Sequence, residues 1–167
     1  HMAAKAVTFA EALEFGKDYA TQTVKNAKAL AVELHNLGFK VLGEKKGFTQ
    51  SHQAVVNVLD YGDGGKIEAD LEKANIIVNR QLIPGDIKAK RHYMHPGGIR
   101  LGSSEVTRLG MKESEMQQIA SFIKNIIIDK KDGKDIAKQI AEFRKKYQKT
   151  QYCFDNKLGA YEYVKLR

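Results

Sequence analysis

The stretch GGIRLGSSEVTRLGM, residues 97–111, is the part of this sequence that carries most information about its fold. Ile99-Arg100-Leu101 alternates apolar, charged and apolar side chains as a short β-strand does, and glycines flank it on both sides. Because glycine has no side chain, another backbone or a ligand can approach such a strand closely. Arg100 would then offer its planar guanidinium to a carboxylate or phosphate. On spacing alone, a structural arginine that caps the following helix or forms a surface ion pair explains the pattern equally well.

Apolar patterns on both sides of this stretch predict further helices and strands. The predicted strands are residues 39–42, 53–59, 76–79 and 99–101. Gly16 separates the first two of the predicted helices, which are residues 3–14, 17–37, 66–73, 112–128 and 134–149. A long loop, residues 80–98, leads into the Arg100 strand, and loops of this length are often functional. Helices segregated from a group of strands are typical of an α+β sandwich with two layers.

The bulk composition is that of one globular domain. The chain has 167 residues, of which 43% are apolar, enough for a hydrophobic core. Cys153 is the only cysteine, which excludes a disulfide framework and a cysteine-rich metal site and fits a reducing cytosol. No apolar run approaches the length that crosses a bilayer, so we expect no membrane partner.

The formal net charge of +8 has two interpretations. An anionic partner, such as nucleic acid or a phosphorylated cofactor, is one of them. However, the positive charges are spread along the chain with only a mild cluster at residues 144–146, and no aromatic-plus-basic motif accompanies them. We therefore favour a soluble basic surface and expect no nucleic-acid partner.

Other polar residues give weaker hypotheses. His92 and His95 are three residues apart, but only the distant Asp86 is available as a third ligand, so we favour an ordinary loop over a metal site. Ser51 and His52 precede a predicted strand, along which adjacent side chains point to opposite faces. This spacing disfavours a hydrogen-bonded nucleophile and base.

Arg108 follows Arg100 at the end of the quoted stretch. It either forms an ion pair with Glu105 or supports a site around Arg100. We favour the structural interpretation for Arg108.

The stretch around Arg100 resembles a known family. Residues 97–111, followed by Glu113, Glu115 and Met116, are similar to the small C-terminal domain of serine hydroxymethyltransferases, and more specifically to the archaeal branch. Further segments follow the pattern of that family in order along nearly the whole chain; they include residues 3–13, 49–53, 71–76 and 79–86. The similarity is therefore more specific than any single motif.

The resemblance implies a fold type I enzyme that uses pyridoxal phosphate. The family moves a one-carbon unit between serine and a reduced pterin, giving glycine, and this part of it has a small, mostly antiparallel sheet with helices packed on one side. The arginine of the Gly-Ile-Arg motif binds the substrate carboxylate in the family, and that residue is Arg100 here. The resemblance also suggests possible pterin-binding or site-lining residues, which are Asn79, Gln81, Ser51, His52 and Arg108.

The resemblance further implies a division of the chain into residues 1–15, the end of an inter-domain helix, residues 16–130, the small domain, and residues 131–167, a C-terminal helix and tail. The family holds its cofactor with a lysine, a phosphate-binding loop and an aspartate of a larger N-terminal domain, and the motifs of these groups do not occur in this sequence. We therefore expect no catalytic residue in this chain and no activity from it alone. Its expected partner is the larger domain, in a cytoplasmic homodimer.

The sequence departs from the family pattern in three places. The aspartate that precedes the histidine in many members has no counterpart at Gln50-Ser51-His52. Gly102-Ser103-Ser104 stands in place of Gly-Thr-Pro. Gln81 stands in place of an asparagine that contacts the pterin in folate-using members, and its amide lies one methylene further out. A modified archaeal pterin is therefore an alternative to tetrahydrofolate.

Two other functions remain open at this point. The chain could be a free-standing, non-catalytic binding module, or the small domain of another fold type I enzyme such as an aminotransferase. The first helix distinguishes a free-standing module from a part of a larger enzyme. A module would cover the apolar strip of Ala6, Phe9, Ala10 and Leu13 within its own fold, whereas a part of a larger enzyme would leave it exposed.

Overall fold

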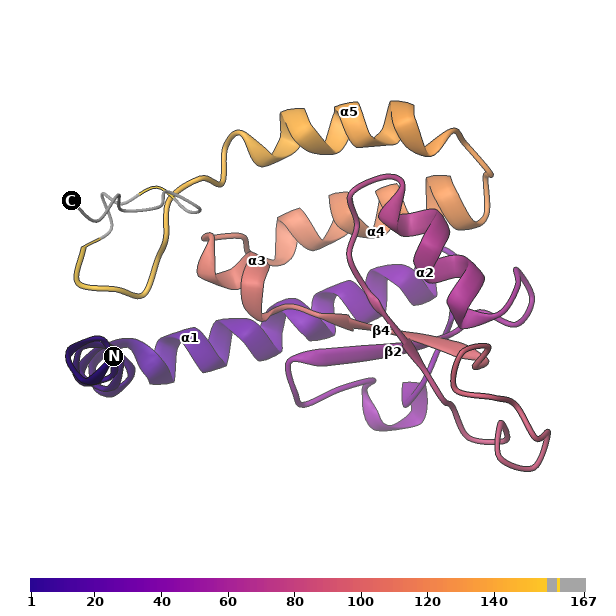
Figure 1. Ribbon diagram of the computed structural model, residues 1–167, viewed down its shortest axis with the longest axis horizontal. Coiled ribbons are helices and arrows are strands. Elements are labelled where there is room, and N and C mark those ends of the chain that lie inside the picture. Colours follow the sequence, from indigo (N-terminus) through magenta and orange to yellow (C-terminus); the bar gives the residue numbers. More distant parts are fainter. Residues whose placement is uncertain (156–158, 160–167) are drawn as a thin grey trace.

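The longest element is the helix α1, which runs without a break over Met2–Asn36 (Figure 1). The computed structural model describes residues 1–155 and 159, and it contradicts the predicted interruption at Gly16. A glycine in a helix interior costs only about 1 kcal/mol relative to alanine, and the residues around it are strong helix formers. The boundary that we placed after residue 15 therefore falls inside a continuous helix.

The two halves of α1 differ in their burial. The C-terminal half contributes to the core with Thr23, Asn26, Ala27, Leu30, Ala31 and Leu34. In the N-terminal half, Phe9 is 67% exposed and Leu13 is 89% exposed. Ala6 and Ala10 of the same apolar strip are exposed as well. The described part of the chain thus leaves this strip uncovered.

The strands of the described residues form one antiparallel sheet in the order β1-β2-β4-β3. Their bounds are Lys40–Val41 for β1, Gln53–Asn57 for β2, Asn79–Gln81 for β3 and Gly98–Gly102 for β4. β4 pairs with β2 along its full length, but with β3 only from Gly98 to Arg100. The Arg100 strand is therefore central at one end and lies at an edge at the other.

Alternation along the two central strands gives the sheet a covered face and an open face. Arg100 and Val55 are half-buried and share the open face, because they are direct partners across the β2–β4 ladder. The residues before and after them along the two strands point to the helices and are buried; they are Ala54, Val56, Ile99 and Leu101. Figure 1 shows the helices on this one side of the sheet. The predicted α+β fold, a small antiparallel sheet with helices on one side, is confirmed.

The remaining helices follow local signals in the sequence. They are α2 (Gly64–Glu72), α3 (Ser104–Arg108), α4 (Glu113–Ile127) and α5 (Gly133–Arg144), besides a short 3-10 turn, η1 (Glu44–Lys46). The Asp63 carboxylate caps α2 by accepting from the Lys66 N–H at 2.9 Å, and Asp132 caps α5 in the same way through Lys134 at 2.9 Å. α3 was not predicted, because one helical turn is too short to show a period. α5 ends at Arg144, before the predicted end at residue 149.

The strand predicted at residues 76–79 lies further along the chain. β3 begins only at Asn79, and Ile77 is 77% exposed. The cause is the turn after α2, where Asn75 has a φ of 61° and the Ile76 N–H donates to the Leu71 carbonyl at 3.0 Å. These residues finish the helix and cannot at the same time pair with β4.

None of the helices in the described part of the chain has the length and apolar character needed to span a bilayer.

Candidate functional site

The open face of the sheet brings together three of the residues singled out in the sequence. Arg100 on β4 lies directly opposite Asn79 on β3, and Gln81 lies opposite Gly98. Since partners across a ladder point to the same face, Arg100, Asn79 and Gln81 share the open face. Their spacing in the sequence does not reveal this, because β3 and β4 are separated by the long loop.

The Arg100 guanidinium has an amide neighbour on this face. Its Nη1 donates to the Gln81 side-chain oxygen at 3.4 Å, which is a long hydrogen bond. No Asp or Glu of residues 1–155 forms an ion pair with Arg100. A half-buried guanidinium with several donors directed at the open side of a sheet is suited to bind a carboxylate.

The glycines around Arg100 serve two different purposes. A Cβ at Gly98 would collide with the Ile83 side chain, and one at Gly97 would lie 2.7 Å from the Asp86 carboxylate. A Cβ at Gly102 would meet nothing within 4 Å. The glycines were expected to admit another part of the chain or a ligand. At Gly97 and Gly98 the close neighbour is the chain itself, mainly the preceding loop, whereas the space beside Gly102 is open.

The loop between β3 and β4, residues 82–97, is fastened by one buried carboxylate. Asp86 is 2% exposed, and its Oδ2 accepts from the Ile83 N–H at 2.9 Å and the Gly97 N–H at 2.7 Å. The Arg91 Nε lies 3.4 Å from its Oδ1. Asp86 therefore binds the two ends of its own loop together, next to the start of β4.

The two histidines of this loop point to separate neighbours. His95 Nδ1 lies 3.3 Å from the Asp63 carboxylate, and His92 Nδ1 accepts from the Met94 N–H at 3.3 Å. The hydrogen bond from the Lys66 N–H lowers the pKa of the Asp63 carboxyl, and His95 adds to this effect. In residues 1–155 and 159, no three His, Cys, Asp or Glu side chains are grouped as metal ligands.

Ser51 and His52 lie in the exposed turn before β2. The Ser51 hydroxyl is 3.2 Å from the Thr49 hydroxyl, and the His52 Nε2 is 2.9 Å from the Gln53 side-chain nitrogen. The backbone carbonyl of His52 accepts from the Ser103 N–H at 2.9 Å. These contacts attach the turn to the end of β4, but they bring neither side chain into contact with Arg100.

Arg108 has a structural role that differs from the predicted pairing with Glu105. Its Nη2 lies 3.3 Å from the Glu11 carboxylate on α1, and its Nη1 donates to the Tyr152 carbonyl at 2.9 Å. Glu11 also accepts from the Phe154 N–H at 3.2 Å. Arg108 thus joins α1 to the segment after α5. Its partners are too distant in the sequence for any local pattern to show them.

Sequence reasoning also missed a buried polar connection behind the site. The Ser103 hydroxyl is buried and donates to the Thr23 carbonyl on α1 at 2.8 Å. Asn26, also buried, donates from its amide to the Thr107 hydroxyl and to the Met111 carbonyl, both at 2.8 Å. These bonds hold β4 and α3 against α1, so the position of Arg100 depends on α1.

Comparison with known proteins assigns the chain to a protein family. A sequence model of the serine hydroxymethyltransferase family matches residues 1–123. The chain belongs to the serine hydroxymethyltransferase family. Serine hydroxymethyltransferases of two archaea, Nitrosopumilus maritimus and Cenarchaeum symbiosum, are 74% and 70% identical to it over 167 residues. In both cases the match covers 100% of this chain and 38% of the relative, so the chain spans well under half the length of these relatives.

A solved structure also resembles this member of the serine hydroxymethyltransferase family. It is the L-threonine transaldolase from Pseudomonas fluorescens in its internal aldimine state, with a TM-score of 0.78 and 39% identity. The match covers 91% of this chain and 34% of that chain. The small antiparallel sheet with its helices is therefore a fold found within larger enzymes of this kind.

Proposed function

We propose that this chain is the part of a pyridoxal-phosphate-dependent serine hydroxymethyltransferase that binds the substrate carboxylate. The enzyme would interconvert serine and glycine and transfer one carbon to a reduced pterin. The observation that carries the proposal is Arg100, a half-buried guanidinium on the open face of the sheet whose neighbour is an amide, not a carboxylate. Membership of the family and the relatives at up to 74% identity support it.

Arg100 would act by orienting the amino acid. Two parallel N–H···O bonds from one guanidinium fix both the position and the plane of a carboxylate. β4 is bonded to β2 along its full length, so the base of the side chain is held by a paired backbone. An amino acid held in this way can present the bond to be broken perpendicular to the cofactor ring. Pyridoxal phosphate, when bound, supplies the electron sink for the negative charge that develops on the substrate.

The residues of the open face fit the substrate better than the cofactor. Arg100 and Gln81 provide donors for a carboxylate, but the family's lysine, phosphate-binding loop and pyridinium-binding aspartate have no counterpart in this sequence. The proposal therefore assigns the cofactor to a larger domain. The same division of roles predicts that this chain alone does not turn over serine.

Gln81 and Asn79 would face the pterin. Their amides carry both donors and acceptors, which suits the mixed donor and acceptor edge of a pterin ring. Gln81 also touches Arg100, so a pterin bound there would lie beside the amino acid. Ser51 and His52 lie at the other end of the open face, and their role as lining residues stays a prediction. Arg108 would support the site through its contact with α1.

The exposed half of α1 would connect to the larger domain. The strip of Ala6, Phe9, Ala10 and Leu13 is uncovered in the described part of the chain, which agrees with the expectation for a part of a larger enzyme. A free-standing module would leave this apolar surface in water. A cytoplasmic homodimer of the whole enzyme remains part of the proposal.

A chimaera tests this function directly. The chain replaces the matching 38% of the Nitrosopumilus maritimus relative, and conversion of serine to glycine is measured with tetrahydrofolate or an archaeal pterin. We expect the chimaera to be active and the 167-residue chain alone to be inactive. Arg100→Lys should raise the KM for serine by about 10- to 100-fold, since one charge-assisted hydrogen bond contributes about 1.5–3 kcal/mol.

Arg80→Lys is the matched control for this substitution. Arg80 lies on β3 but pairs with Glu68 of α2, on the covered side of the sheet. It should leave the KM for serine unchanged. An Arg100→Lys chimaera with unaltered kinetics would refute the role of Arg100. An inactive chimaera that still binds the cofactor would refute the function itself.

The resemblance to the L-threonine transaldolase favours a second candidate. That protein is named as a transaldolase for L-threonine. An enzyme with such an activity would bind the carboxylate of its amino acid in the same way, and we infer for this candidate that no pterin is needed. A chimaera that cleaves hydroxy-amino acids at the same rate with and without a pterin would favour this candidate. A Gln81→Leu variant with a higher KM for the pterin alone would favour the hydroxymethyltransferase.

A further inference from the structure

A second site opens on the covered side of the sheet, where the chain before β3 separates from β4. The pairing between these strands ends at Asn79 and Arg100. The chain before Asn79 does not continue this pairing, since Asn75 and Ile76 form the turn that completes the end of α2. Leu101 and Gly102 therefore have no partner in β3, and a hollow lies beside them instead of another pair of strand residues.

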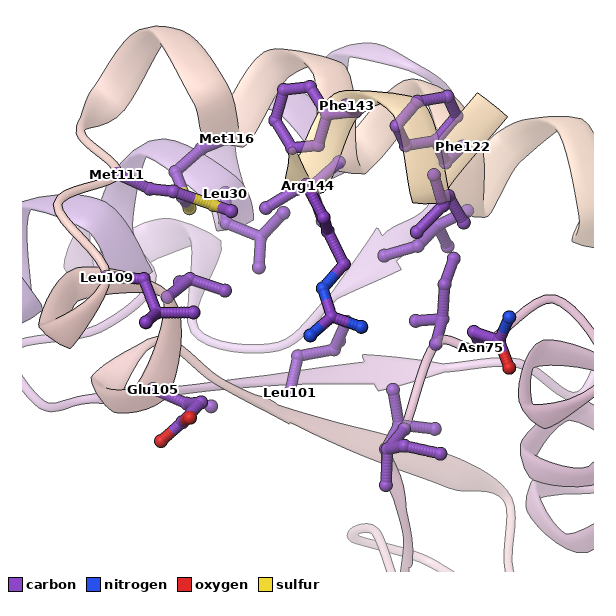
Figure 2. Close-up of a pocket in the computed structure, with 18 residues that line it drawn as sticks. Leu30, Asn75, Leu101, Glu105, Leu109, Met111, Met116, Phe122, Phe143 and Arg144 are labelled. Atoms are coloured by element: carbon purple, nitrogen blue, oxygen red, sulfur yellow. The ribbon is translucent and has the colours of Figure 1, made fainter. Parts of the chain in front are cut away.

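This hollow is an apolar cavity of about 280 Å³. Leu101 on β4 forms one wall, Leu109 and Met116 form a second, and Phe143 of α5 closes it from above (Figure 2). Ile140 of α5 also lines it. Apolar cavities on the order of 150 Å³ already bind ligands of the size of benzene. A cavity of this size and lining can therefore hold a medium-sized apolar group.

One cation enters this apolar space. Arg144, the last residue of α5, extends from the roof toward Leu101, so that its guanidinium lies among aliphatic side chains (Figure 2). A guanidinium stays charged at all ordinary pH values and has five N–H donors. Even with other contacts, it has donors for an anion, and burial by an apolar ligand would strengthen such a bond.

The cavity is open to solvent on one side. Asn75, Ile77, Gly102 and Glu105 line it and are exposed, so they form its rim. Figure 2 shows the Glu105 carboxylate at this rim, turned away from the Arg144 guanidinium. A ligand can therefore enter past the rim and place an anionic group against Arg144.

We propose that this cavity binds a small apolar carboxylate, an aliphatic or aromatic acid whose body fills the hollow and whose carboxylate binds Arg144. The apolar walls exclude sugars and multiply charged acids, because their polar groups would be buried without partners. The guanidinium selects an acid over a neutral compound of the same shape. The site is separate from the Arg100 face, since Leu101 and Arg100 point to opposite sides of β4.

Titration of the 167-residue chain with octanoate and with 1-octanol tests the proposal. Binding is followed by calorimetry and by the amide resonances of residues 75–78, 101–102 and 140–144. We expect saturable binding of one octanoate, and weaker binding of octanol at the same resonances. Acetate, which lacks the apolar body, should not saturate these resonances.

Arg144→Gln distinguishes the contribution of the Arg144 charge to the affinity from that of the apolar cavity. It should weaken octanoate binding by about tenfold or more and leave octanol binding unchanged. Lys145→Gln is the matched control, because Lys145 is the next residue and its ammonium is paired with Glu142 at the exposed surface. It removes the same charge and should change neither affinity.

Val106→Phe distinguishes binding inside the cavity from binding elsewhere on the surface. Val106 lines the hollow, and the larger side chain should abolish binding of both octanoate and octanol. The proposal is overturned if octanoate fails to bind the wild-type chain, if its resonances shift over the whole surface without saturation, or if Arg144→Gln leaves its affinity unaltered.

Discussion

The Arg108 guanidinium on α3 lies 3.3 Å from the Glu11 carboxylate on α1, although 97 residues separate them in the sequence. The same carboxylate accepts from the Phe154 N–H, and Phe154 packs edge-on against Phe15 with 5.5 Å between ring centroids. α1, α3 and the segment after α5 are thus joined at one point, near the C-terminal end of the exposed half of α1.

Glu11→Gln should loosen this junction. The ion pair is partly exposed, so we expect a loss of only about 0.5–1 kcal/mol in the free energy of unfolding, measured by urea denaturation. Hydrogen exchange at residues 151–154 should rise at the same time, since their anchor on α1 is weaker. Glu14→Gln removes the same charge from an exposed position of α1 and should change neither quantity. Equal effects of the two variants would contradict a specific role for Glu11.

Gly98→Ala and Gly102→Ala form a matched pair on one strand. At Gly98 the new methyl group would collide with Ile83 and lie 2.9 Å from the Val56 carbonyl, so we expect a loss of about 1–3 kcal/mol of stability. At Gly102 the methyl group meets open space, and alanine should be neutral or stabilise the strand by about 0.5 kcal/mol. Thermal unfolding of both variants measures the difference. A Gly102→Ala variant as unstable as Gly98→Ala would show that the space beside Gly102 is filled.

Asp86→Ala should release the loop of residues 82–97. It removes the acceptor of two backbone N–H groups at the base of the loop, which leaves them unsatisfied in a buried place. Trypsin should then cleave after Lys88, Lys90 or Arg91 about tenfold faster, as the open form becomes more populated. Asp70→Ala is the control, since within the described residues Asp70 pairs only with the exposed Lys73 at the end of α2. Unaltered cleavage of the Asp86 variant would mean that other contacts hold the loop.

Asp63→Asn should change how stability depends on pH. The Lys66 N–H, helped by His95, lowers the pKa of the Asp63 carboxyl below its usual 3.8. A lowered pKa in the folded state contributes stability that is present above the unfolded pKa and is lost as the pH falls through the folded pKa. Asparagine also caps helices, so the variant should lose up to about 1 kcal/mol near neutral pH and match the wild type in strong acid. Urea unfolding at several pH values measures this; a constant difference across that range would contradict the assignment.

Local sequence patterns determined much of the fold and the central residue of the candidate site. The period of residues 112–128 predicted α4, and the alternation Ile99-Arg100-Leu101 predicted β4 with its arginine facing away from its apolar neighbours. The resemblance of residues 97–111 to a family was enough to single out Arg100. Such signals lie within one helix or strand, where neighbouring side chains alone decide the conformation.

Only the tertiary structure decided what each element packs against. It continued α1 through Gly16, moved β3 to Asn79–Gln81 and gave Arg108 a partner 97 residues away. It also placed Asn79 and Gln81 beside Arg100. The cavity at Leu101 exists because the turn at Asn75 and Ile76 ends α2 and pairing with β4 begins only at Asn79. The physical reason is that these contacts join segments distant in the chain, and their free energy comes from burial and hydrogen bonds that exist only when the segments meet.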